Sequence, residues 1–597
     1  MPMSPKLVLG MCLGSLALTL FLAALDIVIV ITLYDVISEK FNAYGEIGWL
    51  VTGYSLPNAL FTLLWGRLSA LYGLKTCLSA SIIIFEIGSL VVALSYSMSM
   101  LIGGRVIAGI GGSGIQSLVF VVGTSLVEER NRGLVITVLG LAFMVSNAVG
   151  PVLGGAFSQH VSWRWCFYIN LPIGGLAYAM LQGFYNPAQK SFRNTITEQA
   201  YAVKNYRYSN MLTAKFWGFI VRFFIFKLDF IGFALSSAGF VLVLLGLTFG
   251  GEKYSWSSGT IIAYLTVGLV LLILWLLYDF IILPYWGKFL PENERAEPLL
   301  PWASVKIIGA LSGTISNFFV SFGLNMAMIY LIQFYQLVRH ESATASSMHM
   351  WGILVPAIVC IVVQGNIVKK FGVIKPIAVG GVALGTIGAG LLTMQNGSTP
   401  LGHSIGYSIL PGVGFATVMQ STMLSAQIQV EKTDPDFRQK FIELTALNTF
   451  GKAMGMAFGG IVATLIFSTT VKDRLKHADF PVPHFDSSAE IVAYRETHYD
   501  GPESPMAKVL TKGVQNVFYV ALGCYALSFL FTLLMSNKRL VLAPKSDSQH
   551  STKDIEHEAT TIEDSKLEKR DVDIAFLDPH SSGVDSQPPI EQPHRGA

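Results

Sequence analysis

Apolar blocks of about twenty residues recur along most of the chain, separated by short segments of turn residues and charges. The blocks begin near Leu7, Ile47, Cys77, Met100, Leu134, Cys166, Leu228, Thr260, Val305, Met348, Ile377, Ser404, Phe441 and Val517. About twenty apolar helical residues cross the hydrocarbon core of a bilayer. The pattern therefore predicts an all-α polytopic membrane protein with 14 transmembrane helices.

Polar segments divide these helices into groups. We predict an N-terminal six-helix bundle at 1–183, a basic cytosolic linker at 184–227, two extra transmembrane helices at 228–284, a C-terminal six-helix bundle at 285–536 and a disordered cytosolic tail at 537–597. The tail is rich in Ser, Asp and Glu and has no apolar periodicity, so it cannot bury enough surface to fold alone.

The distribution of basic residues predicts the orientation. An even number of helices places both termini on one side, and the basic linker marks that side as cytosolic. The loop from about Thr469 to Gly513 disagrees, because it would lie outside and yet is basic, but long loops constrain topology weakly. Asn396 begins the sequon Asn-Gly-Ser in a predicted external loop and is a candidate glycosylation site.

Composition narrows the class of protein. Hydrophobic residues make up 52% of the chain and charged residues 13%, against about 25% charged in soluble domains, so the lipid bilayer is the solvent that fits. The net charge of +3 is too small to indicate a basic surface that binds nucleic acids. The five cysteines lie far apart and the histidines lack ligand spacing, so we expect no disulfide, no metal site and no enzyme.

Two short sequences occur twice. Gly66 to Gly73 is echoed by Gly365 to Gly372 with the same spacing of the two glycines. Gly150 to Gly155 is echoed by Gly455 to Gly460. Both echoes are eight predicted helices apart. Two six-helix halves with two helices inserted between them would place the echoes at equivalent positions.

Several of these segments resemble the signatures of the fourteen-helix drug:proton antiporter family of the major facilitator superfamily, especially its fungal members. The segments are Leu25 to Val30, Gly66 to Lys75, Leu101 to Gly114, Gly150 to Gly155 and Trp163 to Gly175, and the likeness extends from about Leu7 to Asn537. The resemblance implies the major facilitator fold. The chain also looks like yeast exporters of cationic dyes and vacuolar transporters of basic amino acids.

The resemblance also implies roles for two motifs in conformational change. These motif residues are Gly66, Arg67, Gly73 and Lys75 between helices two and three, and Gly150, Pro151, Gly154 and Gly155 in helix five. The glycines allow close helix approach, and the proline bends the helix. The family links the helix-five motif to export.

The loop motif departs from the family at Ala70, where an acidic residue is usual, so the usual ion-pair latch cannot form. Either the acidic and basic residues at 128–132 supply a substitute, or the inward-closed state is weaker.

Three charged residues lie deep in predicted spans. Asp26 in helix one and Arg105 in helix four have similar depth, and a lone charge there costs at least about 2.5 kcal/mol, so we expect them to be partners. Protonating the carboxylate would release the arginine, which gives a proton-sensitive switch. The alternative is a pair that only pins two helices. Glu86 in helix three is a candidate proton site or cation counter-charge, or else a packing residue.

Other polar residues in the spans have weaker interpretations. Glu443 lies near a membrane boundary and is interpreted as a solvated helix end. Lys452 lies deeper but is long enough to snorkel, with a role in coupling as the alternative. Aromatic and amide residues are candidates to line a cavity that accepts flat cations, with packing as the alternative. These cavity candidates are Tyr54, Asn58, Asn147, Asn325, Tyr330 and Gln420.

Together these features predict a proton-coupled antiporter that exports hydrophobic or cationic drugs or dyes. No Walker-type phosphate loop is present, so we expect the proton gradient to drive transport without a cofactor. We expect a monomeric, multi-pass protein of the plasma membrane with cytosolic termini, whose partners are the bilayer, protons and small cationic or amphipathic molecules. Two alternatives are a vacuolar proton-coupled transporter of basic amino acids and a non-transporting sensor.

Overall fold

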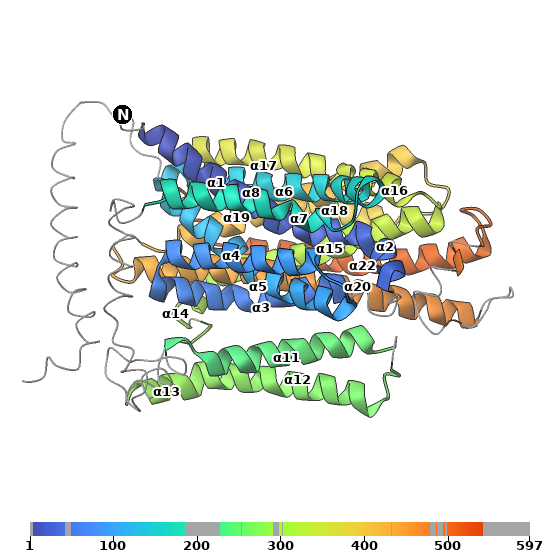
Figure 1. Ribbon diagram of the computed structural model, residues 1–597, viewed down its shortest axis with the longest axis horizontal. Helices are drawn as coiled ribbons and strands as arrows, with labels where there is room; N and C mark the ends of the chain where they lie inside the picture. The colour runs from blue at the N-terminus through green and yellow to red at the C-terminus, as the bar shows by residue number, and fades with distance from the viewer. Residues whose placement is uncertain are drawn as a thin grey trace, which may run out of the picture. The chain divides into compact units, whose positions relative to one another are not determined.

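The computed structural model describes residues 4–41, 49–186, 227–251, 254–289, 298–300, 302–431, 433–477, 485, 494–495 and 498–540. The predicted linker and tail fall outside these residues, except for 184–186, 227 and 537–540. The described residues are almost entirely helical and contain no β-strand (Figure 1).

Six spanning segments form the N-terminal half. They are α1 (Pro5–Ile29), α3 (Trp49–Tyr72), α4 (Leu74–Ala93), α5 (Met98–Ser125), α6 (Glu129–His160) and the pair α7 (Trp165–Tyr168) and α8 (Asn170–Phe184). A 3₁₀ turn at Val30–Leu33 and α2 (Tyr34–Phe41) extend α1. Helix α1 packs against α6 and α8, while α5 packs against α3 and α4.

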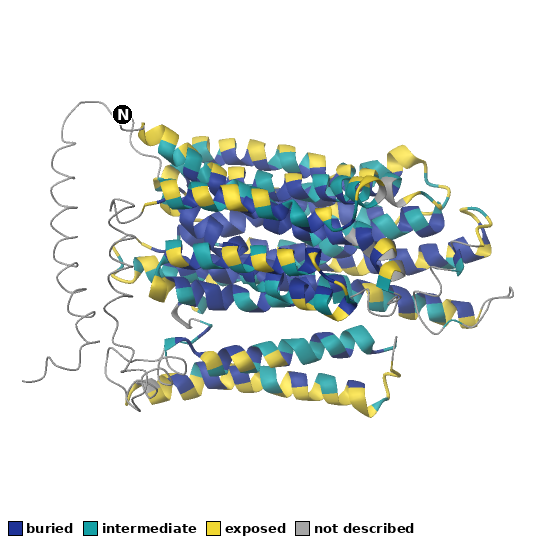
Figure 2. Ribbon diagram, in the orientation of Figure 1, coloured by how far each residue is buried: buried dark blue, intermediate teal, exposed yellow. Residues whose placement is uncertain are grey.

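Two further helices follow the N-terminal half. Helix α11 (Phe230–Phe249) packs against α12 (Gly259–Leu277), which continues through a π-helical turn at Tyr278–Ile282 into α13 (Leu283–Gly287). Helix α11 also contacts α3 and α20, whereas α12 exposes most of its apolar surface (Figure 2). Because exposed apolar side chains are stable against lipid tails, α12 has the composition of a lipid-facing helix.

The C-terminal half has the same number of spanning segments. They are α15 (Ile308–Gln333) with a π-helical turn at Phe334–Val338, α16 (Ala343–His349) leading into α17 (Trp351–Phe371), α18 (Lys375–Leu392), α19 (Leu401–Gln427), α20 (Phe437–Lys476) and α22 (Pro505–Leu533). The short helix α14 (Trp302–Val305) precedes them.

The packing pattern repeats between the halves, as the sequence echoes predict. The contacts of α1 with α6, α3 with α5 and α4 with α5 correspond to those of α15 with α20, α17 with α19 and α18 with α19. The halves meet through α3 against α20 and α6 against α17, which are themselves equivalent pairs. Gly73 and Gly372 end α3 and α17 with φ of +86° and +67°, a conformation that favours glycine. This explains why the repeated sequence ends in a glycine in both halves.

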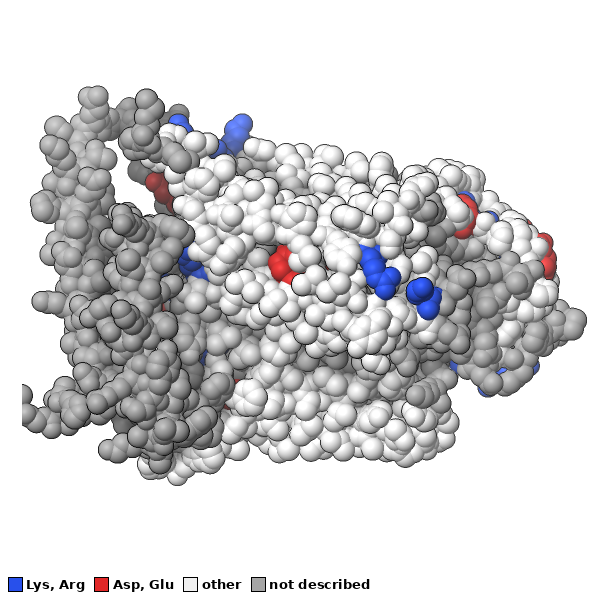
Figure 3. All heavy atoms as spheres, in the orientation of Figure 1, with Lys and Arg blue, Asp and Glu red and all other residues white. Residues whose placement is uncertain are grey.

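Twelve of the described helical segments are long and apolar enough to cross a membrane. The other two predicted spans are α3, which contacts α5 and α20, and α7 with α8, where a break leaves α8 only 15 residues long. Each predicted span thus has a helical counterpart. Over the helices, the face in Figure 3 is largely free of charged side chains.

The predicted boundaries of the last external loop are wrong. Helix α20 continues to Lys476, and α22 begins at Pro505 rather than near Val517. Both helices extend beyond the apolar block with polar and basic residues, so hydropathy alone underestimates their length. Asn396 lies exposed between α18 and α19, where its side-chain oxygen accepts hydrogen bonds from Ser398 and Thr399, each at 2.8 Å.

Candidate functional site

Asp26 on α1 and Arg105 on α5 form a buried ion pair. Their side chains are 0% and 1% exposed. Nε of Arg105 donates to the carbonyl oxygen of Leu50 at 2.9 Å, and Nη1 donates to the carboxylate and also to the carbonyl oxygen of Asp26, the latter at 3.2 Å. The guanidinium lies 4.6 Å from the centre of the Tyr54 ring. The structure therefore joins the two residues that their similar depth predicted as partners.

Asn170 links this pair to two more helices. Its side-chain nitrogen donates to the second carboxylate oxygen of Asp26 at 3.3 Å and to Oγ of Ser89 at 3.2 Å. A buried ion pair is maintained only when further hydrogen bonds offset the loss of hydration. Asn170 supplies one of these, yet sequence reasoning did not select it as a site residue. Its position inside the Trp163 to Gly175 motif was the available signal.

Glu86 lies on α4, one helical turn before Ser89, and its side chain faces α8 at Gly174. Both carboxylate oxygens are buried, and no described residue forms a hydrogen bond with them. A Cβ atom added at Gly174 would collide with this carboxylate. The structure thus places Glu86 at the contact of α4 with α8, near the Asp26 pair, and its role as a proton site stays a prediction.

The helix-five motif lies directly against the helix that carries Asp26. A Cβ atom at Gly150 would lie 3.5 Å from the side chain of Leu25, and one at Gly154 would lie 3.0 Å from the carbonyl oxygen of Ile29. Pro151 is inside α6, followed by Gly155 in the same helix. The motif therefore lets α6 approach α1 on both sides of Asp26. Movement of one helix is expected to shift the other.

The loop motif connects the two halves. Nη1 of Arg67 lies 3.9 Å from the carboxylate of Glu443 on α20, and its Nε donates to the carbonyl oxygen of Lys227 at 3.0 Å. The carboxylate of Glu443 also accepts from Oγ of Ser304 at 2.9 Å. The interpretation of Glu443 as a solvated helix end is therefore wrong, because its side chain is only 11% exposed. The opposite half supplies the acidic group that the family motif usually has at Ala70.

The neighbouring motif residues also make specific contacts. A Cβ atom at Gly66 would lie 2.7 Å from that of Ala446, so α3 and α20 approach closely beside Arg67. Gly73 forms the turn into α4, and Nζ of Lys75 donates to the carbonyl oxygen of Gln182 at the end of α8, at 3.2 Å. The motif thus connects the same end of α3, α8 and α20.

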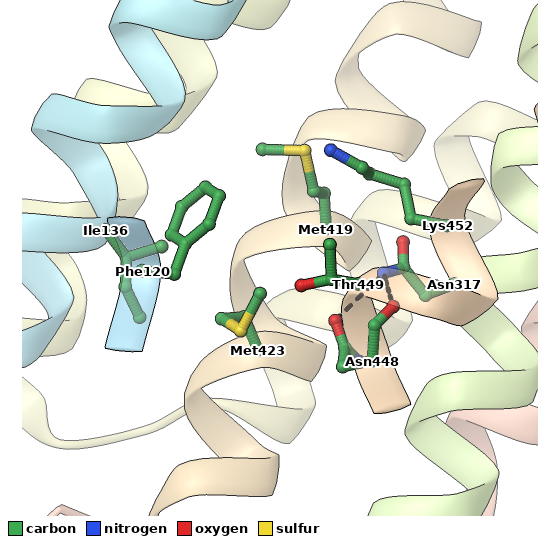
Figure 4. A pocket seen from close by; sticks show the side chains of 8 residues that line it. All are labelled: Phe120, Ile136, Asn317, Met419, Met423, Asn448, Thr449 and Lys452. Atoms are coloured by element: carbon green, nitrogen blue, oxygen red, sulfur yellow. Dashed lines mark hydrogen bonds between the residues drawn. The ribbon is translucent and has the colours of Figure 1, made fainter. Parts of the chain in front are cut away.

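A small cavity lies between the halves (Figure 4). Its lining comes from α5 and α6 on one side and from α15, α19 and α20 on the other: Phe120, Ile136, Asn317, Met419, Met423, Asn448, Thr449 and Lys452. Lys452 is the charged member of this set. Its side chain does not snorkel to a surface, because Lys452 is only 3% exposed. Sequence reasoning favoured snorkelling and gave a role in coupling only as the alternative.

The predicted cavity residues lie elsewhere. Gln420 donates from α19 to Oγ1 of Thr137 on α6 at 2.8 Å, so it joins the halves. Tyr54 donates to a carbonyl oxygen of α1, Asn147 to one of its own helix, and Asn325 to one of α20. Asn58 lies on α3, and the ring of Tyr330 packs against a phenylalanine of α20. None of the six lines the cavity described above, and their role in substrate binding stays a prediction.

Two buried carboxyl groups meet at the base of the inserted helices. Asp229 precedes α11 and Asp279 lies after α12, and both are 0% exposed. A Cβ atom added at Gly232 would lie within 2.6 Å of both Oδ2 of Asp229 and Oδ1 of Asp279, so the two carboxyl groups are neighbours. Consecutive backbone N–H groups of Leu299 and Leu300 donate to Asp229 at 2.7 Å and to Asp279 at 3.2 Å. Sequence reasoning missed this pair, which joins residues 50 positions apart.

Repeated helical halves, inserted helices and buried charges at helix contacts define a polytopic membrane transporter. The chain belongs to the Major Facilitator Superfamily, whose family model matches residues 16–264. Protein SGE1 of Saccharomyces cerevisiae is 47% identical, over 91% of this chain and 99% of that protein.

Other similar proteins agree on the family. Vacuolar basic amino acid transporter 5 of Saccharomyces cerevisiae is 43% identical over 90% of this chain and 93% of that protein. Azole resistance protein 1 of the same yeast is 42% identical over 88% of each chain. The crystal structure of the human organic anion transporter MFSD10 (TETRAN) shares the fold, with a TM-score of 0.50 and 14% identity over 89% of this chain and all of that one.

Proposed function

We propose that this protein is a proton-coupled antiporter that exports hydrophobic, drug-like compounds from the cell. The observation that carries the proposal is the buried pair of Asp26 and Arg105 beside the glycine-rich face of α6. A proton can neutralise this carboxylate, and it competes with the arginine for it. The proton gradient would then supply the energy, with no need for ATP or a bound cofactor.

Protonation of Asp26 would change the contact between α1 and α5. A neutral carboxyl group attracts the guanidinium of Arg105 less strongly, while the hydrogen bond from Arg105 to Leu50 is unaffected by the added proton. Because α1 packs against Gly150 and Gly154 of α6, its displacement would move α6 as well. Helix α6 contacts α17 of the other half, so the movement has a route to the contact between the halves.

The cavity supports a hydrophobic substrate more than a cationic one. Its lining includes Phe120, Ile136, Met419 and Met423, and its charged member is the cation Lys452. Asp26 is enclosed by Arg105 and Asn170 and does not line the cavity, so a cationic substrate has no direct path to its carboxylate in this conformation.

The proposed location is the plasma membrane, with both termini in the cytosol and the protein acting as a monomer. A second candidate is proton-coupled uptake of basic amino acids into the vacuole. The similarity to a protein named vacuolar basic amino acid transporter 5 favours this candidate. Fluorescence microscopy of a tagged copy distinguishes the two candidate functions, because export from the cell requires the plasma membrane and storage requires the vacuolar membrane.

The coupling is tested with purified protein in proteoliposomes that have an acidic interior. The test substrate is rhodamine 6G, a cation whose large ring system is hydrophobic. We expect the wild type to accumulate this dye, and we expect Asp26→Asn to lose gradient-driven accumulation while it still reconstitutes. The control is Asp473→Asn, which makes the same change at an exposed carboxylate near the end of α20. Full activity of Asp26→Asn would remove this residue from the mechanism, and a wild type indifferent to the gradient would refute proton coupling.

A further inference from the structure

Lys452 is a buried cation inside a membrane protein, and no described Asp or Glu pairs with it. Its Nζ donates to Oε1 of Gln116 at 3.3 Å and lies 4.3 Å from the centre of the Phe143 ring. Both contacts are with neutral groups. A charge in a low-dielectric interior is costly without a counter-charge. Packing alone therefore does not explain why a lysine is present at this buried position.

The two partners of Lys452 belong to the opposite half of the protein. Lys452 lies on α20, whereas Gln116 lies on α5 and Phe143 on α6. If the halves separate during transport, the ammonium loses both contacts and faces the opened cavity. In a space that holds little water, an anionic oxygen of a bound molecule is the group that best stabilises the ammonium in place of the two lost contacts.

The other lining residues suit an aromatic molecule. Phe120 offers a ring face, and Met419 and Met423 are flexible, polarisable side chains that adapt to different shapes (Figure 4). Asn317 donates to the side-chain oxygen of Asn448 at 2.9 Å. This leaves Oδ1 of Asn317 and Nδ2 of Asn448 without a described hydrogen-bond partner. The cavity thus offers apolar contact, one cation, and an unused polar donor and acceptor.

We propose that Lys452 binds the anionic oxygen of the substrate, and that the preferred substrates are amphipathic aromatic compounds with a carboxylate or phenolate group. The inference rests on the proposed export function and specifies its substrate class. Phe120 and the two methionines contact the ring system, while the asparagine pair binds further polar groups. Cationic compounds of the same size bind less well, because the ammonium repels them.

The simplest rival role is a structural one, in which Lys452 only fastens α20 to α5 and α6. The two roles differ in their dependence on substrate charge. Loss of a fastening residue alters the transport of every substrate alike, whereas loss of an anion-binding residue affects acidic substrates alone. Fluorescein and rhodamine 6G make a suitable pair of probes, because both carry a xanthene ring system with a pendent phenyl ring, but one is an anion and the other a cation.

The experiment measures uptake of both dyes into proteoliposomes with an acidic interior and the membrane potential clamped at zero. Passive diffusion drives a weak acid out of an acidic interior, so fluorescein retained inside reports the transporter. The variants are Lys452→Met, which removes the charge, and Lys452→Arg, which keeps it. Lys476→Met is the control, because Lys476 is exposed near the end of the same helix.

We expect Lys452→Met to lower fluorescein uptake by about tenfold, the effect of losing roughly 1.4 kcal/mol of binding, and to leave rhodamine 6G uptake unchanged or higher. Lys452→Arg retains most fluorescein uptake. The proposal is overturned if Lys452→Met lowers both dyes equally or neither. A wild type that moves rhodamine 6G but not fluorescein overturns this inference alone, whereas a wild type that moves neither dye also refutes the proposed export function.

Discussion

The guanidinium of Arg67 and the carboxylate of Glu443 lie 3.9 Å apart on opposite halves of the protein. The family motif usually has an acidic residue at the place of Ala70, on the same half as the arginine. Here the carboxylate comes from α20, where Ser304 and Gln439 also donate to it. The charge pair consequently bridges the two halves instead of bracing one of them.

Removing the charge of Glu443 should favour separation of the halves at this end. We expect Glu443→Gln to cost about 1 kcal/mol, which shifts the equilibrium toward the open state roughly fivefold. The measurement is the rate of thiol labelling at Ala446→Cys, which is packed against Gly66 in the closed state. The labelled variants are made in a protein whose five native cysteines have been replaced, so that only the introduced thiol reacts.

A charge exchange provides the control for this prediction. Arg67→Glu alone should speed labelling more than Glu443→Gln, because it places two like charges at the contact between the halves. The double variant Arg67→Glu/Glu443→Arg should restore slow labelling in part. If labelling is equally slow in all variants, the pair does not hold the halves together.

Removing one or both charges of the Asp26–Arg105 pair should affect stability and proton coupling differently. Asp26→Asn leaves the guanidinium of Arg105 buried without its counter-charge, which is expected to cost about 3 kcal/mol or more. The double variant Asp26→Asn/Arg105→Gln removes both charges. We expect the double variant to have a higher thermal unfolding midpoint in detergent than the single variant and still to lack gradient-driven transport. Gradient-driven transport by the double variant would contradict the assignment of the proton site to this pair.

The sequence predicts the parts of this structure that depend on local pattern. Apolar length locates the spanning helices, and the spacing of glycines reveals the two equivalent halves. Asp26 and Arg105 are predictable partners because the helical rise fixes their depth in the membrane. Two opposite charges at equal depth in a hydrophobic layer are expected to pair, because each is costly alone.

Contacts between the halves are harder to predict. Glu443 seemed a solvated helix end, and Lys452 seemed long enough to reach a surface, because hydropathy measures depth but not which way a side chain faces. Their partners, Arg67 and Gln116, lie more than 300 positions away along the chain. The meeting of Asp229 with Asp279 likewise depends on how α11 packs against α12. Only the packed structure brings these groups together.

The close approach of α6 to α1 should tolerate no side chain at Gly154. We expect Gly154→Ala to cost about 1–3 kcal/mol, as overpacking typically does, and to slow transport. The matched control is Gly103→Ala, because nothing lies within 4 Å of a Cβ atom there. Both changes favour the helix by about 0.5–1 kcal/mol in the absence of clashes. Thermal unfolding and dye uptake of the two variants would be compared, and equal behaviour would show that α6 and α1 are not tightly packed.

The carboxyl groups of Asp229 and Asp279 should make stability depend on pH. Two adjacent buried carboxyls are most stable when they share one proton, because ionising both places like charges side by side. Raising the pH removes that proton from the folded protein, so stability falls as pH rises. Asp279→Asn keeps a hydrogen-bonding group and prevents the second ionisation. We expect it to raise the thermal unfolding midpoint relative to the wild type at pH 8 and to match the wild type at pH 5. The exposed Asp473→Asn serves as the control. If the unfolding midpoints of the wild type and of Asp279→Asn change in the same way between pH 5 and pH 8, the carboxyls share no proton.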